Sequence, residues 1–474
     1  MSFFHWFWIF NAVVVILLVV NDRKRPEKTL AWIFILLLLP VVGIVFYLFL
    51  GVDWKKHRLS SEIKISKYLK DNYQNGKNKA VGYDQLVKFL YNRNDSILFQ
   101  KNDIEVFFDG KKLFDDIKEE IKKAKHHIHM EYFIWQNDKL GNEIKDLLVE
   151  KSKEGVTVRI IIDRVGSGKI DKKFEEDMKN AGIELLFYSY FLKQFLKVIN
   201  LQINNRDHRK IIIIDGNIGY IGGYNIGDEY LGEGKLGYWR DTHLKIKGDY
   251  VYSLQAVFSD DFYRTMKADN IPDSFDGEAK DYFPEIEEKN NGVSLQTVKS
   301  GPRSVTPSIM QTVVKLIESA KDHIYIITPY FVPTEAVTTA LITAAYSGVD
   351  IKIIFPGKAD HPGVYNASQT YLDDIIGHGI EVYFYTPESF IHAKTLTVDG
   401  KVGTVGTANM DIRSYKLNYE INSVIYDEKT IEKIEDQFNE DLSKSKLIPD
   451  DYFNKLPFFV KIWQSVMRIF SGMY

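Results

Sequence analysis

The residues best suited to chemistry in this chain occur in one pattern, H-x-K-x4-D-x6-G-x2-N, which is present twice. Its polar members are His208, Lys210, Asp215 and Asn225 in the first copy, and His392, Lys394, Asp399 and Asn409 in the second. In a chain of 474 residues, one chance copy has odds on the order of 10⁻⁴ at typical residue frequencies. Two copies therefore indicate a duplicated functional unit.

Each residue type in the pattern has a use in chemistry at a phosphodiester. An imidazole can attack phosphorus, and a second imidazole can protonate the departing alkoxide. Histidine suits both roles because its ordinary pKa of about 6.5 leaves both protonation states available near neutral pH. Lysine and asparagine side chains can hold the non-bridging oxygens as negative charge builds. Because lysine supplies the positive charge, the pattern predicts neither a metal ion nor a cofactor.

A short apolar run follows each His-x-Lys pair and predicts a buried strand. Side chains alternate in direction along a strand, so the histidine and lysine of each copy share one face, whereas Asp215 and Asp399 point the opposite way. Gly216 and Gly400 come next, which is typical of an Asp-Gly hairpin turn. The turn favours a structural role for both aspartates, and we keep them among the candidate catalytic residues as members of the motif.

A second pair of carboxylates follows the two motifs. Asp241, in Tyr-Trp-Arg-Asp-Thr-His, and Glu420, in Asn-Tyr-Glu-Ile, stand at the heads of corresponding predicted strands. A catalytic histidine needs a carboxylate on its other ring nitrogen, which fixes the tautomer and stabilises the imidazolium. We therefore predict that Asp241 and Glu420 support the motif histidines, and that Asn225 and Asn409 contact the substrate phosphate.

Composition limits the classes of function. The chain is 45% hydrophobic and 26% charged, which is typical of a globular protein, and it contains no cysteine. Its net charge of −3 gives no basic surface for a polyanion and argues against nucleic acid as a partner. His127, His129 and Glu131 alternate along one predicted strand, but we expect them to line the core or a pocket rather than to bind a metal.

Two apolar stretches near the N-terminus, 3–20 and 31–52, contain no Asp, Glu, Lys or Arg. Each is close to the roughly 20 residues that a helix needs to cross a bilayer, so they predict a two-span transmembrane hairpin. The first stretch lacks the basic start and the cleavage site of a signal peptide. Lys and Arg lie on both sides of the second span, which leaves the membrane side of the rest of the chain open.

The duplication extends beyond the motifs, because Ala124-Lys-His-His-Ile resembles Ala320-Lys-Asp-His-Ile and each half repeats a β-α-β order. The first half has an extra aromatic segment at 189–205, which we expect to form a flap over the site or against lipid. The predicted segments are a transmembrane hairpin (1–52), a connector (53–100), a first α/β half (101–267, motif 203–230), a solvated acidic linker (268–292), a second α/β half (293–447, motif 387–414) and an amphipathic C-terminal helix (456–474).

The C-terminal helix has one polar stripe along an apolar surface. We expect it to lie in a membrane interface, with packing on the protein's own surface as the alternative. Its stripe consists of Lys461, Gln464, Ser465, Arg468 and Ser471.

The doubled motif resembles the signature of the phospholipase D superfamily. That resemblance implies two similar α/β halves facing each other, so that both motifs meet in one pseudo-twofold active site. Three further stretches are similar to bacterial cardiolipin synthases in particular, namely the hairpin sequence from Arg25-Pro26 to Tyr47, Tyr238-Trp-Arg-Asp-Thr-His, and Gly406-Thr-Ala-Asn-Met-Asp-Ile-Arg-Ser-Tyr-Lys-Leu-Asn-Tyr-Glu. Gly223 stands where many superfamily members have serine.

The implied reaction joins two phosphatidylglycerol molecules into cardiolipin and glycerol through a phosphatidyl-histidine intermediate. It implies an integral protein of the bacterial cell membrane whose partners are phosphatidylglycerol and anionic membrane lipids; the oligomeric state is left open. We assign His208 as the nucleophile and His392 as the acid and base, although the pseudo-symmetry makes the two similar. A membrane-bound phospholipase D that releases phosphatidic acid, and a non-catalytic lipid-binding scaffold, are the alternatives.

Overall fold

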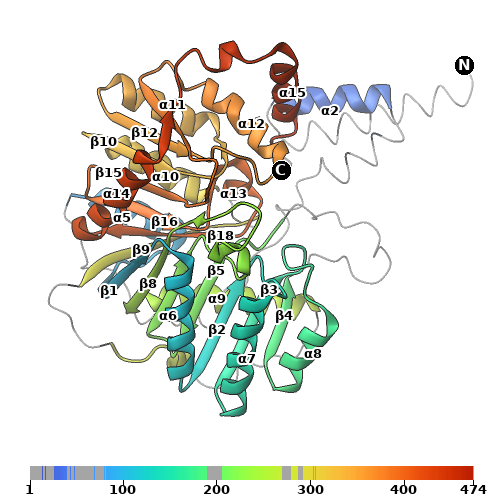
Figure 1. The fold of residues 1–474 in the computed structure, drawn as a ribbon, viewed down its shortest axis with the longest axis vertical. Helices are drawn as coiled ribbons and strands as arrows, with labels where there is room; N and C mark the ends of the chain where they lie inside the picture. The colour runs from blue at the N-terminus through green and yellow to red at the C-terminus, as the bar shows by residue number, and fades with distance from the viewer. Residues whose placement is uncertain are drawn as a thin grey trace, which may run out of the picture. The chain divides into compact units, whose positions relative to one another are not determined.

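The computed structural model describes residues 26–39, 80, 82–188, 205–269, 279–286, 292–302, 304 and 306–472, together with a few isolated positions. These residues fall into two units, and nearly all of them belong to one that contains both motifs (Figure 1). The other unit includes α2 (Pro26–Leu38).

The first half of the larger unit alternates strands and helices before its motif, as the sequence predicts. Its elements are β1 (Phe99–Phe107), α6 (Gly110–Lys123), β2 (His127–Tyr132), α7 (Lys139–Lys153), β3 (Thr157–Asp163), α8 (Lys172–Asn180), β4 (Glu184–Tyr188), β5 (Lys210–Ile214), β6 (Ile218–Gly222), β7 (Trp239–Arg240), β8 (His243–Gly248) and α9 (Val251–Asp269).

The second half repeats this order. Its elements are β9 (Val293–Ser300), α10 (Ser308–Ser319), β10 (His323–Ile327), β11 (Phe331–Val332), α11 (Glu335–Tyr346), β12 (Asp350–Phe355), α12 (Pro362–Asp373), β13 (Ile380–Tyr385), β14 (Phe390–Ile391), β15 (Thr395–Val398), β16 (Val402–Gly406), β17 (Met410–Asp411), α13 (Ile412–Lys416), β18 (Glu420–Tyr426), α14 (Glu428–Ser443) and β19 (Ser445–Leu447), followed by α15 (Phe458–Ile469).

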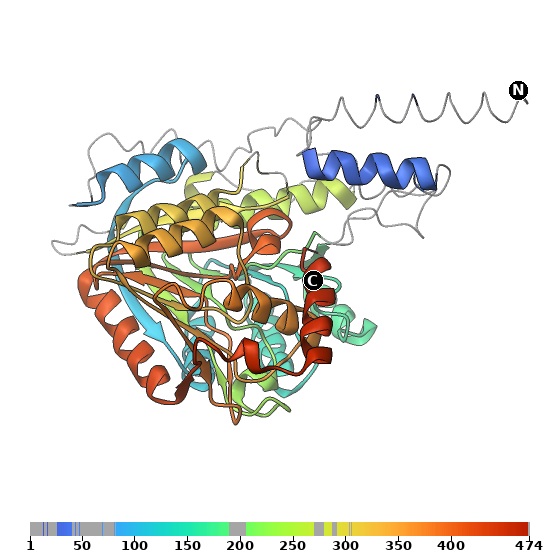
Figure 2. The ribbon, with the colours of Figure 1, turned by 90° about the horizontal axis from the view of Figure 1, so that it is seen from above.

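Fifteen of the described strands form one continuous sheet, in the order β19-β13-β12-β10-β15-β16-β18-β9-β1-β8-β6-β5-β2-β3-β4. The halves join where β1 pairs antiparallel with β9. In each half the motif strand lies next to the first parallel strand, β5 beside β2 and β15 beside β10. The sheet therefore brings both motifs to one continuous framework, with helices on both of its faces (Figure 2).

The motif strand β5 shows why this sheet is covered on both sides. Ile212 and Ile214 pack under α6, α7 and α8, while Ile211 and Ile213 pack against α9 on the other face. A strand buried on both faces reads as a continuous apolar run, which is the Ile211–Ile214 sequence. The helix α6 begins at its N-cap Asp109, whose carboxylate accepts from the backbone N–H of Lys112 at 3.0 Å.

Short crossed pairings tie the halves together outside the main sheet. Strand β14 of the second half pairs in parallel with β7 of the first, and an isolated bridge joins Asp207 to Tyr419. In both cases the segment that precedes a motif histidine pairs with the segment that precedes a supporting carboxylate. The two contacts are pseudo-symmetric equivalents.

The segments predicted to be a solvated acidic linker and a polar, helix-containing connector both contribute to the core. Within the stretch predicted to be a solvated linker, Tyr282 and Phe283 are each only 5% exposed, because Tyr282 packs over His127 and His129. Within the predicted connector, α5 (Asp84–Asn94) buries Leu86 and Leu90 in the core of the second half. Both segments are therefore parts of the folded unit.

The N-terminal predictions fall mainly on residues outside the described part of the chain. Stretch 3–20 lies there almost entirely, and α2 covers only the start of stretch 31–52. Among the described residues, no helix is both long enough and apolar enough to cross a membrane. The predicted flap at 189–205 also lies outside them, apart from its last residue.

Candidate active site

Each motif histidine is held at the start of its strand by a hydrogen bond from its own backbone. The His208 N–H donates to the Tyr419 carbonyl at 3.0 Å, and the His392 N–H donates to the Arg240 carbonyl at 2.7 Å. The residue after each of these carbonyls is a carboxylate, Glu420 or Asp241. One crossed pairing thus positions both the histidine and its acid.

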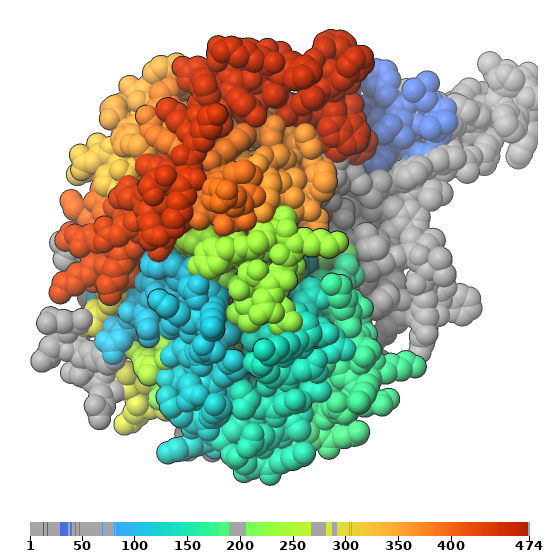
Figure 3. Space-filling model, in the orientation of Figure 1, coloured from blue at the N-terminus to red at the C-terminus, as the bar shows by residue number. Residues whose placement is uncertain are grey.

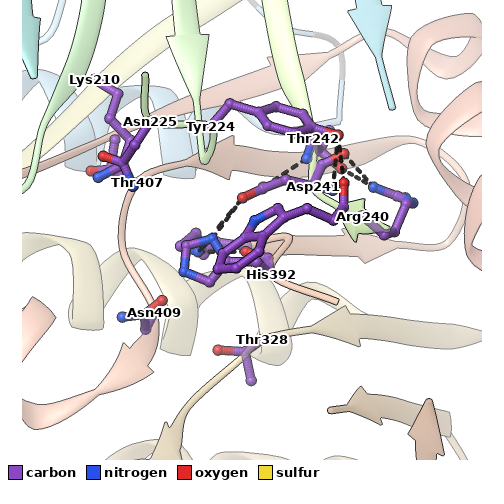
Figure 4. A network of polar contacts seen from close by, with 12 residues as sticks. Lys210, Tyr224, Asn225, Arg240, Asp241, Thr242, Thr328, His392, Thr407 and Asn409 are labelled. Atoms are coloured by element: carbon purple, nitrogen blue, oxygen red, sulfur yellow. Dashed lines mark hydrogen bonds and ion pairs between the residues drawn. The ribbon is translucent and has the colours of Figure 1, made fainter. Parts of the chain in front are cut away.

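The histidine rings meet these carboxylates directly. His208 Nδ1 lies 3.0 Å from Glu420 Oε2. His392 Nδ1 lies 2.7 Å from Asp241 Oδ2 (Figure 4). Both carboxylates are fully buried. With Nδ1–H donating to a carboxylate, Nε2 carries the lone pair or the transferable proton. Each acid serves the histidine of the opposite half.

The side chain of Asp241 is shorter than that of Glu420, and different neighbouring residues accommodate the two carboxylates. A Cβ on Gly223 would stand 2.0 Å from Asp241 Oδ1, so only glycine leaves room for this carboxylate. At the equivalent position Thr407 donates its hydroxyl to Glu420 Oε2 at 2.6 Å. Asn418 adds a contact of 3.3 Å to the other oxygen of Glu420. Glycine at position 223 therefore makes space for Asp241, whereas the threonine hydroxyl binds Glu420.

The motif lysines lie beside the histidines. Lys210 Nζ donates to the His208 carbonyl at 2.9 Å, and Lys394 Nζ contacts the His392 carbonyl while lying 4.0 Å from Asp241 Oδ2. Burial lowers the pKa of Lys210 to about 7 and that of Lys394 to about 8. Both lysines can therefore gain or lose a proton near neutral pH, and an anionic ligand would favour their charged form.

Burial also lowers the pKa of both histidines. The pKa of His392 falls to about 4, because burial acts together with the nearby charge of Lys394. For His208, burial and the lysines Lys210 and Lys394 lower the pKa, while Glu420 raises it. Since Lys394 acts on the ring of the other motif, the two copies share one electrostatic environment. Both rings are neutral at pH 7 in the absence of an anion.

The two asparagines lie near the motifs but differ in their partners. The Asn225 side chain donates to the Tyr230 hydroxyl at 2.9 Å and accepts from the Ile134 N–H at 3.2 Å. Asn409 lies on the His392 side of the site, and its Oδ1 is buried with no hydrogen-bond partner among the described residues (Figure 4). A role in phosphate binding stays a prediction for both.

The motif aspartates do not reach the histidines. Five residues of strand, about 17 Å, separate Lys210 from Asp215, whose carboxylate accepts from three backbone N–H groups at 125–127, at 2.8 to 3.1 Å. Asp399 binds the N–H groups at 321–323 in the same way. Both have a positive φ, 51° and 53°, as residues of a tight turn. Their place among the candidate catalytic residues is corrected accordingly, since these hydrogen bonds describe a structural role.

Aromatic rings complete the walls of the site. Phe133 packs edge-on to the His208 ring at 4.9 Å, and Trp239 packs against His392 at 5.1 Å. Tyr224 accepts from the Asp241 backbone N–H at 3.1 Å. No sequence pattern identifies these rings or Thr407 as site residues, although Trp239 and Tyr224 are close to the motif positions in sequence.

The two histidines of β2 that could imitate a metal site contact other side chains of the folded unit. His127 and His129 both lie 3.1 Å from Gln255 Oε1, and His129 stacks on Phe258. In the part of the chain that the structure describes, no three His, Asp or Glu side chains are grouped to hold a metal ion.

Comparison with known proteins agrees with this geometry. Residues 117–238 and 313–442 match the family described as cardiolipin synthase, PLD-like domain, and residues 6–51 match the phospholipase D-nuclease N-terminal family. The chain is 37% identical to a cardiolipin synthase of Oceanobacillus iheyensis and 36% identical to the major cardiolipin synthase of Bacillus subtilis. Each alignment covers 98% of this chain and 97% of the relative.

A solved structure supports the fold. The phosphatidylserine synthase of Haemophilus influenzae superimposes with a TM-score of 0.65 at 17% identity, over 82% of this chain and all of that one. The family model matches both halves, and the relatives align over nearly the full chain. This chain therefore belongs to the cardiolipin synthases, phosphatidyltransferases of the phospholipase D superfamily.

Proposed function

We propose that this enzyme transfers a phosphatidyl group from one phosphatidylglycerol to the terminal hydroxyl of another, giving cardiolipin and free glycerol. The observation that carries the proposal is the pair of crossed histidine–carboxylate contacts, His208 with Glu420 and His392 with Asp241. They supply two imidazoles with defined tautomers, which is what a two-step transfer needs.

In the first step, His208 Nε2 attacks phosphorus, and the bond from phosphorus to the glycerol oxygen breaks. His392 gives a proton to that oxygen, so glycerol leaves as a neutral alcohol. The substrate phosphate brings negative charge beside Lys394 and His392, which raises the pKa of the ring and allows it to carry this proton. Lys210 and Lys394 hold the non-bridging oxygens.

In the second step, neutral His392 takes the proton from the terminal hydroxyl of a second phosphatidylglycerol. The resulting oxygen attacks phosphorus, the bond from phosphorus to His208 breaks, and cardiolipin leaves. The first step exchanges a phosphorus–oxygen bond for a phosphorus–nitrogen bond, and the second step does the opposite. The transfer is therefore reversible. Water in place of the second lipid would give phosphatidic acid.

We propose an integral membrane location with two N-terminal spans at 3–20 and 31–52. The match of residues 6–51 to an N-terminal family of phospholipase D-like proteins supports a defined unit there. A membrane location favours transfer over hydrolysis, because it surrounds the site with lipid hydroxyl groups. It also makes anionic phospholipids the expected partners.

The proposal is tested by lipid analysis. Purified full-length protein is incubated with phosphatidylglycerol vesicles in the presence of a chelator, and lipids and glycerol are measured by mass spectrometry and enzymatic assay. Cardiolipin with equimolar glycerol is expected from the wild type and from His126→Ala, an exposed histidine at the far end of β2. No product is expected from His208→Ala, and phosphatidic acid as the main wild-type product would mean hydrolysis instead.

A further inference from the structure

The C-terminal helix α15 packs on the protein with its polar side. Its neighbour is α12, where Gln464 donates to Gln369 at 2.6 Å and Ser471 meets the Tyr371 hydroxyl at 2.9 Å. Arg468 donates to the Thr370 carbonyl at 3.0 Å and lies over the Tyr371 ring. The polar stripe of the predicted amphipathic helix is therefore largely used for docking on α12.

The opposite side of α15 is apolar and exposed. Exposed fractions reach 82% for Phe459, 78% for Ile469 and 69% for Phe458. We call the following residues the apolar face of α15: Phe458, Phe459, Ile462, Trp463, Ile469 and Phe470. A helix on a water-facing surface usually has the reverse arrangement, with its apolar side turned inward. The helix lies at the outer surface of the molecule (Figure 3).

The composition of this face and the substrates of the enzyme indicate the kind of surface that it suits. Lys455 pairs with Asp451, and Arg468 pairs with Asp374 beside α12, so Lys461 is the cation of the helix that has no ion pair with a described residue. Aromatic and aliphatic side chains at the edge of a cationic residue are typical of elements that lie in the interface of an anionic bilayer. Because the substrates of a cardiolipin synthase are membrane lipids, a bilayer is the surface that this face meets during turnover.

The helix is also connected to the active site through α12. The loop before α12 carries Asp360, which accepts from the Tyr330 hydroxyl. Tyr330 follows Thr328, whose hydroxyl accepts from the Met410 N–H at 3.1 Å, next to Asn409. Thr328 lies on the His392 side of the site (Figure 4). The element that supports α15 therefore begins at the edge of the site.

We propose that the apolar face of α15 inserts into the interface of the anionic membrane that supplies the lipid substrates, and thereby orients the active site toward them. This inference rests on the proposed function for the identity of the substrate. The polar contacts with α12 anchor the helix to the protein, so that the apolar face acts as a fixed contact between protein and lipid.

The absence of cysteine allows a direct test with the full chain. Single-cysteine variants Phe459→Cys and Asp146→Cys are labelled with an environment-sensitive fluorophore and reconstituted in vesicles that contain phosphatidylglycerol and spin-labelled lipid. Asp146 is a matched control because its side chain is 73% exposed on α7, far from α15 (Figure 1). We expect strong quenching by the spin-labelled lipid at position 459 and none at position 146.

Two outcomes would overturn the inference. A probe at position 459 that reports water, as at position 146, would leave the apolar face unoccupied. A probe that is shielded from water but not quenched by lipid would indicate that a second copy of the chain covers the face. Neither readout depends on turnover, so both remain informative if the enzyme makes no cardiolipin.

A second experiment separates orientation from catalysis. The double variant Phe459→Ser/Trp463→Ser is compared with Tyr346→Ser, which removes an exposed aromatic residue from α11 instead. For the double variant, turnover of bilayer phosphatidylglycerol should fall about tenfold or more, because apolar burial at the interface is lost. Turnover of short-chain phosphatidylglycerol dissolved as monomers should not change. Equal loss on both substrates, or loss on neither, would contradict the proposal.

Discussion

At the scale of single residues, the site separates two kinds of acid that the sequence places close together. Asp241 contacts a histidine ring, whereas Asp215 contacts only backbone N–H groups. Burial raises the pKa of Asp241, but Lys394 and His392 outweigh it and lower the pKa below its usual value. Asp241 is thus a charged partner of the imidazole.

Replacing each acid by its amide should therefore have opposite consequences. Asp241→Asn removes the charge that supports the imidazolium, and we expect kcat to fall by a factor of roughly 10² to 10⁴ with little loss of stability. Asp215→Asn keeps a side chain that tolerates positive φ but weakens charged hydrogen bonds, and should cost about 1–2 kcal/mol of stability at nearly full kcat. Turnover and thermal unfolding of both variants check this, and full turnover in Asp241→Asn would remove its supporting role.

The motif lysines make anion binding depend on pH. The pKa values of about 7 for Lys210 and about 8 for Lys394 mean that both are charged at acidic pH and neutral at alkaline pH. Affinity for glycerophosphoglycerol, a soluble headgroup analogue, should therefore fall as pH rises from about 7 to about 9, approaching tenfold per lysine per pH unit. Calorimetric titration measures it. In Lys210→Arg the charge persists to high pH, so the decline should be shallower, and a flat wild-type curve would contradict the assignment.

At the level of elements, Arg240 links β7, directly before Asp241, to helix α14. Its guanidinium forms an ion pair of 2.8 Å with Asp441 on α14 and donates to Thr242 at 3.0 Å, and both Arg240 and Asp441 are buried. Asp441 already has a raised pKa because of burial, partly offset by Arg240. The ion pair therefore neutralises a charge inside the junction between the halves.

Removing only one partner should be costly. Arg240→Met leaves Asp441 buried without its cation, and we expect a loss of about 3–5 kcal/mol in the free energy of unfolding. The double variant Arg240→Met/Asp441→Leu should recover a large part of that loss, because no unpaired charge remains. Chemical denaturation of the three proteins in one detergent provides the comparison, and a double variant as unstable as the single one would show that the ion pair itself is essential.

Sequence reasoning works here where the signal is local. The spacing places Lys210 beside His208, whose carbonyl accepts from Lys210 Nζ, and the repeat singles out Asp241 and Glu420 as the acids near the rings. Which acid meets which histidine depends on the pairing of β7 with β14, a contact between segments about 150 residues apart, and no local pattern carries it. The inward polar side of α15 likewise depends on α12, since a helical wheel shows two faces but not their neighbours.

At the scale of the whole molecule, one chain contains everything that both histidines need. The acid of each ring comes from the other half, and the continuous sheet through β1 and β9 holds the halves in register. Two inactive variants, His208→Ala in the first half and His392→Ala in the second, damage different halves of the chain. If the site forms within each chain, a co-reconstituted mixture of the two contains no intact site.

We therefore expect the mixture of His208→Ala and His392→Ala proteins to be no more active than the sum of the two alone. Turnover of phosphatidylglycerol, measured at several protein-to-lipid ratios, checks this. Chains that exchange halves would restore a complete site in a fraction of the assemblies, and activity would then rise with the density of protein in the membrane. Such a rise would mean that the sheet junction at β1 and β9 also forms between neighbouring chains.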